Sequence, residues 1–395
     1  MDIVTLHGKY DIYKENALPQ RRFKYNKLNE VLQKHLHKKK FNFLYCGYSF
    51  EKRPINLLKY GSGPTTVLIM SQMHGNEPVS TLALTDVMNF MESDEELNHI
   101  IKEKITFYVL ALVNPDGNEK NDRRNAQGID INRDAKSLIS PEAVFLTKVV
   151  KEINPKFVLN LHDEELYYMT KPLLLQTAIA MLAPECEISP KALKARSNAM
   201  KLISCISQTL EPIAKNRIAR YDDVYTPEAF GDTFISNGIS SVLIEAGSAE
   251  GDKERCFARK TVFCAILTAL ESVANSSYDF FSEDIYQNLP LNIRYKSFDL
   301  KLKNLEIKSE YGSYRVDLGI RRIKPTFNDE DFTDDFTDYR IVNIGKLDNY
   351  GALKTFDASE FCLKGNYSDI YIGKKSDFTI INSFGIEKEC QSLLL

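Results

Sequence analysis

Residues 65–78 read TTVLIMSQMHGNEP, an apolar run that passes directly into a polar turn. A short continuous apolar run of this kind, bounded by turn residues, predicts a β-strand that is buried on both faces. Comparable runs occur at 105–113, 157–161, 173–176 and 240–246. Because helix-like segments separate the runs, they predict strands of a single sheet in an α/β fold.

The segments between these runs have the apolar spacing of helices that cover a sheet. Apolar residues recur at intervals of three and four in residues 79–91, 141–153 and 257–273, and also in residues 28–36 near the N-terminus. We therefore expect a mixed, mostly parallel central sheet flanked by helices.

The pattern changes near residue 280. Beyond this point the segments alternate apolar and polar residues and are separated by Gly, Asn and Asp, as in 295–307 and 339–345. This alternation is typical of half-buried strands. We predict a first domain at 1–280, with its chemically informative motifs in about 60–275, and a small β-rich domain of unassigned role at 281–395.

Composition excludes several classes of protein. The 395 residues include 51 Lys and Arg and 54 Asp and Glu, so the net charge of −3 does not suggest a nucleic-acid binder. No apolar stretch reaches the roughly 18 residues that a membrane span needs. The charged N-terminus lacks the apolar core of a secretory signal, so we expect a cytoplasmic protein. The seven cysteines are odd in number and show no metal-type spacing, which favours reduced thiols.

An acidic stretch at 328–339, NDEDFTDDFTDY, offers many carboxylates. It lacks the glycine and the final glutamate of an EF-hand calcium loop. We interpret it as a solvated loop.

Three residues predict a metal site. His74 follows the apolar run at 65–70, and Glu77 lies three residues later, on the same face of a turn. His162 follows the run at 157–161. Two histidines and a carboxylate, with a fourth position left for water, form a typical catalytic zinc site. A single His-x-x-Glu pair also occurs by chance on protein surfaces, so the neighbouring motifs must decide.

Further candidate residues lie in the loop between Glu77 and His162, and another lies in a later apolar run. Arg123, Arg124, Asn132 and Arg133 lie in a Gly- and Asn-rich loop that follows the run at 105–113. Guanidinium groups can hold a carboxylate or stabilise an oxyanion, although a solvated basic loop would look the same. Glu245 ends an apolar run, where a carboxylate is costly without a partner or a role. We predict that Glu245 is a general base beside the metal.

Taken together, these motifs resemble the zinc carboxypeptidases of the carboxypeptidase A type. The resemblance covers roughly residues 60–275 and is closest to a bacterial branch typical of Bacteroidetes. Several motifs in one order are far more specific than any single match. In chain order they are HGNEP (74–78), NPDG (114–117), RRNAQGIDINRD (123–134), NLH (160–162) and SVLIEAG (241–247).

The resemblance assigns a role to each site residue. It implies one zinc per chain held by His74, Glu77 and His162, with Glu245 as the catalytic glutamate. Arg123 matches the arginine that polarises the scissile carbonyl. The pair that holds the terminal carboxylate of the substrate corresponds to Asn132 and Arg133.

Other positions match less closely. Tyr225, twenty residues before Glu245, matches the tyrosine that caps the substrate, with Tyr221 as a weaker candidate. Asp232 falls where the family has the floor of its pocket. The chain has Asp163 after His162, where digestive enzymes commonly have Ser or Gly. It also reads NRD at 132–134, where the family more often reads NRN.

The resemblance implies a metallopeptidase whose partner is a peptide with a free C-terminus. One alternative is a deacylase of N-acyl amino acids resembling aspartoacylase and succinylglutamate desuccinylase, which share the zinc motif. Another is a catalytically silent binding protein of the same fold, although all the key positions are filled here. The sequence leaves the oligomeric state and the preferred terminal residue open.

Overall fold

The computed structural model describes residues 2–18, 22–164, 167–222, 224–252, 254–294, 296–322 and 338–394. By their contacts, the residues form two compact units. The first comprises Met1–Glu165, Thr177–Ser248 and Lys253–Asn292. The second comprises Leu166–Gln176, Ala249–Asp252 and Ile293–Leu395. The division at residue 280 stays a prediction.

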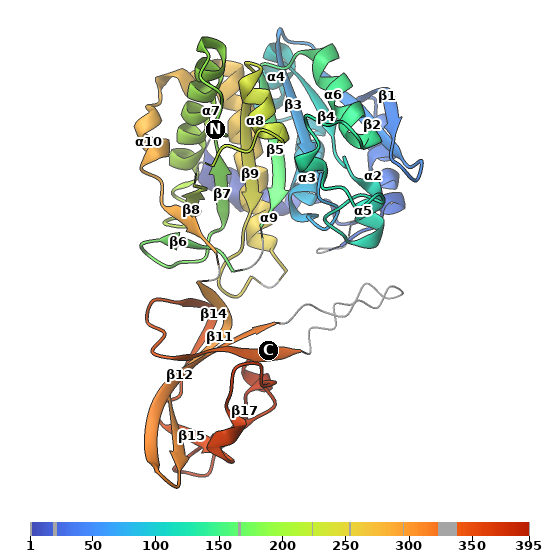
Figure 1. The fold of residues 1–395 in the computed structure, drawn as a ribbon. Coiled ribbons are helices and arrows are strands. Elements are labelled where there is room, and N and C mark those ends of the chain that lie inside the picture. Colours follow the sequence, from blue (N-terminus) through green and yellow to red (C-terminus); the bar gives the residue numbers. More distant parts are fainter. Residues whose placement is uncertain are drawn as a thin grey trace. The chain divides into compact units, whose positions relative to one another are not determined.

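The first unit is built on a mixed sheet with the strand order β1-β2-β4-β3-β5-β9-β7-β8-β10 (Figure 1). Its central strands β4, β3, β5 and β9 are parallel, whereas β1–β2, β2–β4 and β7–β9 pair antiparallel. The predicted α/β class is confirmed. The strands are β1 Asn42–Tyr48, β2 Pro54–Gly61, β3 Thr65–Ser71, β4 Ile105–Leu110, β5 Phe157–Asp163, β7 Ile179–Leu182, β8 Ile218–Arg220, β9 Ser240–Ala246 and β10 Leu291–Ile293.

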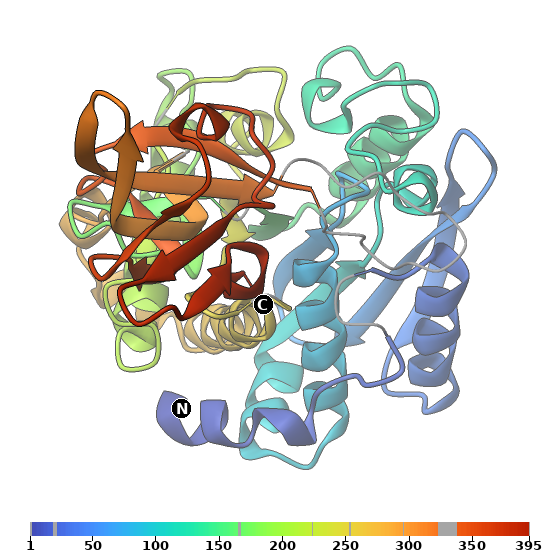
Figure 2. The same cartoon turned by 90° about the horizontal axis from the view of Figure 1, so that it is seen from below.

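Helices flank this sheet, and Figure 2 shows α3 and α4 (cyan) lying side by side. Within the described ranges, no helix is long and apolar enough to cross a bilayer. The α-helices are α1 Ile3–Gly8, α2 Tyr25–His37, α3 Val79–Glu92, α4 Glu96–Lys104, α5 Pro115–Lys120, α6 Pro141–Ile153, α7 Pro190–Leu210, α8 Phe230–Ser236, α9 Cys256–Asn275 and α10 Glu283–Gln287. The short 3-10 turns of this unit are η1 Tyr10–Ile12, η2 Ile131–Arg133 and η3 Ser277–Phe280.

Side chains of the central strands alternate between two apolar cores. Val67 and Ile69 of β3 pack in the core that contains residues of α3, α7 and α9. Leu68 and Met70 pack in the core of α6 and α8. The same alternation along β5 places Leu161 in the first core and Val158 in the second. Residues that follow on β5 therefore project alternately toward α3 and toward α6 and α8.

The region before residue 280 differs from the sequence prediction in one strand and one helix. The run at 173–176 is not a strand: Leu173 is exposed, and the β-pairing of this run in the described part of the chain is an isolated bridge between Gln176 and Met169. The buried strand is instead β7, a few residues later. The prediction also omitted α7, although Ser189 caps its first turn and Pro190 occupies the first helical position.

The second unit is β-rich, as predicted. Its sheet has the order β13-β12-β11-β15-β16-β17, and β14 pairs with the first half of β11. A separate apolar core fills this unit. Residues 328–337 of the acidic stretch lie outside the described residues. The strands and turns are β6 Met169–Lys171, β11 Ser297–Ser309, β12 Gly312–Arg322, β13 Tyr339–Gly345, β14 Gly351–Asp357, β15 Phe361–Lys364, η4 Tyr367–Asp369, β16 Thr379–Asn382, β17 Glu387–Glu389 and η5 Gln391–Leu393.

Candidate metal centre and active site

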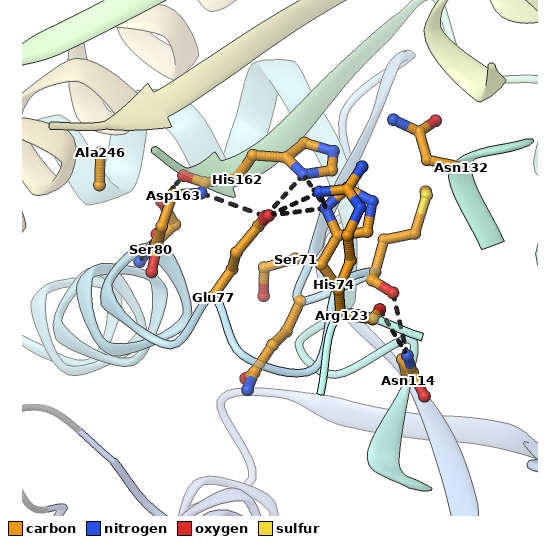
Figure 3. Close-up of polar contacts among 12 residues, drawn as sticks. Ser71, His74, Glu77, Ser80, Asn114, Arg123, Asn132, His162, Asp163 and Ala246 are labelled. Atoms are coloured by element: carbon orange, nitrogen blue, oxygen red, sulfur yellow. Dashed lines mark hydrogen bonds and ion pairs between the residues drawn. The ribbon is translucent and has the colours of Figure 1, made fainter. Parts of the chain in front are cut away.

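Two glycines bring the first ligand turn against the first turn of α5. A Cβ atom added to Gly75 would lie 2.0 Å from the carbonyl carbon of Gly117, so the two backbones touch. Asn114, the N-cap of α5, donates to the carbonyl oxygens of Met73 and Arg123 at 3.2 and 3.4 Å. The HGNEP and NPDG motifs and the start of the arginine loop therefore form one packed assembly (Figure 3).

The three predicted ligands converge at the carboxyl ends of β3 and β5. His74 Nδ1 lies 2.7 Å from Glu77 Oε1, and His162 Nδ1 lies 2.8 Å from Glu77 Oε2. The two Nδ1 atoms are 3.2 Å apart (Figure 3). All three side chains are buried. The structure therefore brings together the residues that the sequence predicted as a metal site.

This donor set suits a zinc ion. Zinc takes histidine nitrogens and carboxylate oxygens at about 2.0–2.2 Å, so tetrahedral neighbours lie about 3.3 Å apart. The observed separations of 2.7–3.2 Å need only a small outward movement to reach that value. Burial raises the pKa of Glu77, but the two histidines outweigh it and hold this pKa below its ordinary value. Glu77 is therefore available as an ionised ligand.

Asp130 orients the first histidine, a role that the sequence reading did not assign. Its Oδ1 lies 3.1 Å from His74 Nε2 and can accept the ring proton there, which leaves Nδ1 to the metal. Burial works against ionisation, but contacts with His74 and Arg123 lower the pKa of Asp130 below its ordinary value. His162 Nε2 is buried and has no such partner in the described part of the chain.

Arg123 lies against the donor set rather than in solvent. Its Nε donates to Asp130 Oδ2 at 3.0 Å, and its Nη1 donates to His74 Nδ1 at 3.2 Å. The side chain remains 44% exposed, so it can leave the donor atoms when another group binds. This position favours Arg123 over Arg124 as the arginine that acts beside the metal. Arg124 instead donates to the carbonyl of Gly128 in its own loop.

Glu245 lies beside the metal ligands through strand pairing. β5 and β9 are parallel, and His162 is the direct partner of Glu245 in their register. Residues paired in this way project from the same face of a sheet. Glu245 Oε2 is buried without a hydrogen-bond partner among the described residues. Burial, and then the carboxylates of Glu77 and Glu164, raise the pKa of Glu245 well above its ordinary value.

The predicted substrate-binding residues gather near α8. Asn132 Oδ1 accepts a hydrogen bond from Phe230 N, and this fixes the amide. Arg133 donates to the carbonyl of Asn132 at 2.8 Å. Burial raises the pKa of Asp232 to about 6, and the charge of Arg133 opposes this shift. Arg133 and Asp232 therefore lie within electrostatic reach of each other.

The two candidate capping tyrosines have different partners. Tyr225 donates to Glu187 at 3.0 Å. Tyr221 donates to Glu164 at 2.7 Å. Glu164 is buried, which raises its pKa to about 8, and it contributes to the raised pKa of Glu245. Tyr221 is therefore linked to the neighbourhood of Glu245, whereas a role for Tyr225 stays a prediction.

Comparison with known proteins relates this site to a family. The family model described as zinc carboxypeptidase matches residues 30–145, which contain His74, Glu77 and the arginine loop. The predicted resemblance to zinc carboxypeptidases is confirmed. The zinc carboxypeptidase match and the fold together indicate a hydrolase of the metallocarboxypeptidase type. The family uses zinc, and His74, Glu77 and His162 supply donors for one ion. No curated protein sequence matches the chain.

Several solved structures share the fold. A metallo-carboxypeptidase from Burkholderia cenocepacia has 16% identity and a TM-score of 0.51, with 65% of this chain and 70% of that chain covered. A metallo-carboxypeptidase from Pseudomonas aeruginosa in complex with (2-guanidinoethylmercapto)succinic acid has 17% identity and a TM-score of 0.50, with 64% of this chain and 70% of that chain covered. A carboxypeptidase A from Helicoverpa armigera has 15% identity and a TM-score of 0.50, with 70% of this chain and 80% of that chain covered. These findings do not favour the deacylase alternative.

Proposed function

We propose that this protein is a zinc-dependent carboxypeptidase that releases residues from the C-terminus of peptides. The observation that carries the proposal is the convergence of His74, Glu77 and His162 beside Glu245, the partner of His162 across the sheet. Glu245 Oε2 is buried and has no hydrogen-bond partner among the described residues, and its position next to a set of metal ligands suits a general base.

His74, Glu77 and His162 would hold the metal through Nδ1, a carboxylate oxygen and Nδ1. When bound, zinc would polarise the scissile carbonyl and lower the pKa of a water molecule to about 7. Asp130 keeps the proton of His74 on Nε2, so that Nδ1 retains its lone pair.

Glu245 acts as the general base and then as the general acid in this reaction. Its carboxylate accepts the proton of the attacking water and then donates it to the amine that leaves. The raised pKa of Glu245 makes it a stronger base than an exposed glutamate. Arg123, which is half-exposed beside the donor set, donates to the carbonyl oxygen as negative charge develops there.

Asn132 and Arg133 select the bond that is cut. Since Phe230 N occupies Asn132 Oδ1, the Nδ2 group of this amide remains as a donor for a substrate carboxylate. Arg133 adds charged donors. Holding the terminal carboxylate places only the last peptide bond over the metal. By the resemblance to the family, Asp232 would lie at the floor of the pocket for the terminal side chain, and the charge of Arg133 opposes the burial that raises its pKa.

A matched pair of peptides tests the exopeptidase character. We expect the wild-type protein to cleave a peptide with a free C-terminal carboxylate about a hundredfold faster than its C-terminal amide, measured as kcat/KM. Amidation removes the charge that Arg133 binds. Arg133→Ala should lose most of this preference and keep its zinc, whereas Arg124→Ala is the matched control.

Equal cleavage of the two peptides would overturn the carboxypeptidase proposal, even with the metal ligands correct. An N-acyl amino acid serves as a third substrate in the same assay. Faster hydrolysis of this compound than of the free peptide would identify a deacylase instead.

A further inference from the structure

Asp163, the residue after the ligand His162, does not face the metal donors. The alternation along β5 directs its side chain toward α3, away from the face that carries His162. There Asp163 Oδ2 accepts a hydrogen bond from Val79 N at 2.5 Å, and Oδ1 accepts one from Ser80 N at 2.8 Å. The carboxylate thus caps the first turn of α3.

This cap comes from a distant part of the chain because α3 has none of its own. The residue at its N-cap position is Pro78, which provides no side-chain hydrogen bond. The first backbone N–H groups of a helix need partners, and a carboxylate also interacts favourably with the helix dipole. Asp163 is 7% exposed, so water is largely excluded from these bonds.

Two further hydrogen bonds run between the same two segments, which carry the metal ligands. Ser80 Oγ donates to the carbonyl of His162 at 2.6 Å, and Asp163 N donates to Glu77 Oε2 at 3.2 Å (Figure 3). Glu77 lies two residues before α3, and His162 lies one residue before Asp163. The four hydrogen bonds therefore join the two segments that carry Glu77 and His162.

We propose that Asp163 is a positioning residue that presets the metal site by fastening the start of α3 to the end of β5. The inference rests on the proposed function only in taking His74, Glu77 and His162 as the metal ligands. In this arrangement Glu77 and His162 are held at ligand separation before a metal binds. Residues that hydrogen-bond to metal ligands and orient them typically contribute about 10- to 100-fold to metal affinity.

The test is the zinc dissociation constant, measured by competition with a chromophoric chelator and without any peptide substrate. Asp163→Ala should raise this constant by about 10- to 100-fold. Asp163→Asn keeps one acceptor oxygen and should recover part of the loss, which also provides a variant that folds if the alanine variant does not. Ser80→Ala removes the hydrogen bond from Ser80 Oγ to the carbonyl of His162, and it should raise the zinc dissociation constant by a smaller factor.

The second unit provides a matched control for general destabilisation. Asp317 is 5% exposed and likewise accepts two backbone N–H groups, from Asn304 and Leu347, each at 2.9 Å. Asp317→Asn should leave the zinc dissociation constant unchanged. The proposal is overturned if Asp163→Ala binds zinc as tightly as the wild type, or if Asp317→Asn weakens binding equally. Because no peptide is hydrolysed in this assay, the result is independent of whether the protein proves to be a carboxypeptidase.

Discussion

Glu245→Gln is expected to lower turnover by about 10²–10⁴-fold while zinc remains bound. The amide has nearly the shape of the carboxylate but cannot accept a proton from the attacking water. The side chain lies beside His162 in the paired strands without contributing to the donor set, so the metal should be retained.

The comparison needs kcat and the zinc content of the same preparations. Glu250→Gln is a suitable control, because Glu250 is an exposed glutamate close by in the sequence. Turnover of Glu245→Gln close to that of the wild type would remove Glu245 from the proton-transfer role. Loss of zinc from this variant would instead place Glu245 among the ligands.

Replacing either histidine ligand should remove the metal altogether. His74→Ala and His162→Ala each leave two protein donors of three, and a catalytic zinc site normally uses three. We expect the zinc content to fall from about one per chain to near zero after gel filtration, with peptidase activity lost in parallel.

Elemental analysis of the purified variants checks this expectation. The control is His99→Ala, because His99 has an exposed side chain and contacts only Asp94 among the ion pairs described. A full complement of zinc in His162→Ala would show that His162 is not a ligand.

Much of the fold follows from local sequence patterns. The apolar runs of β3, β5 and β9 have almost the observed boundaries, because strands buried on both faces carry a strong local signal. The run at 173–176 misled the prediction, since an apolar run alone does not show whether a core is present to cover it. Leu173 is 52% exposed in the structure.

The candidate site could be predicted only in part. The spacing of His74 and Glu77 predicts that they lie together, and the place of Glu245 at the end of an apolar run makes it a candidate. Asp130 and Asp163 act on residues 56 to 84 positions away in the chain, so no local pattern identifies their partners. The only available signal was that each acid adjoins or shares a loop with a site residue.

The most direct test of the account is mass spectrometry of the products formed from a peptide with a free C-terminus. Zinc-loaded protein is compared with protein stripped by a chelator and with stripped protein to which zinc is restored. We expect successive loss of single residues from the C-terminus, abolished by stripping and recovered with zinc. Cuts inside the peptide, or the same products from metal-free protein, would contradict the assignment as a zinc carboxypeptidase.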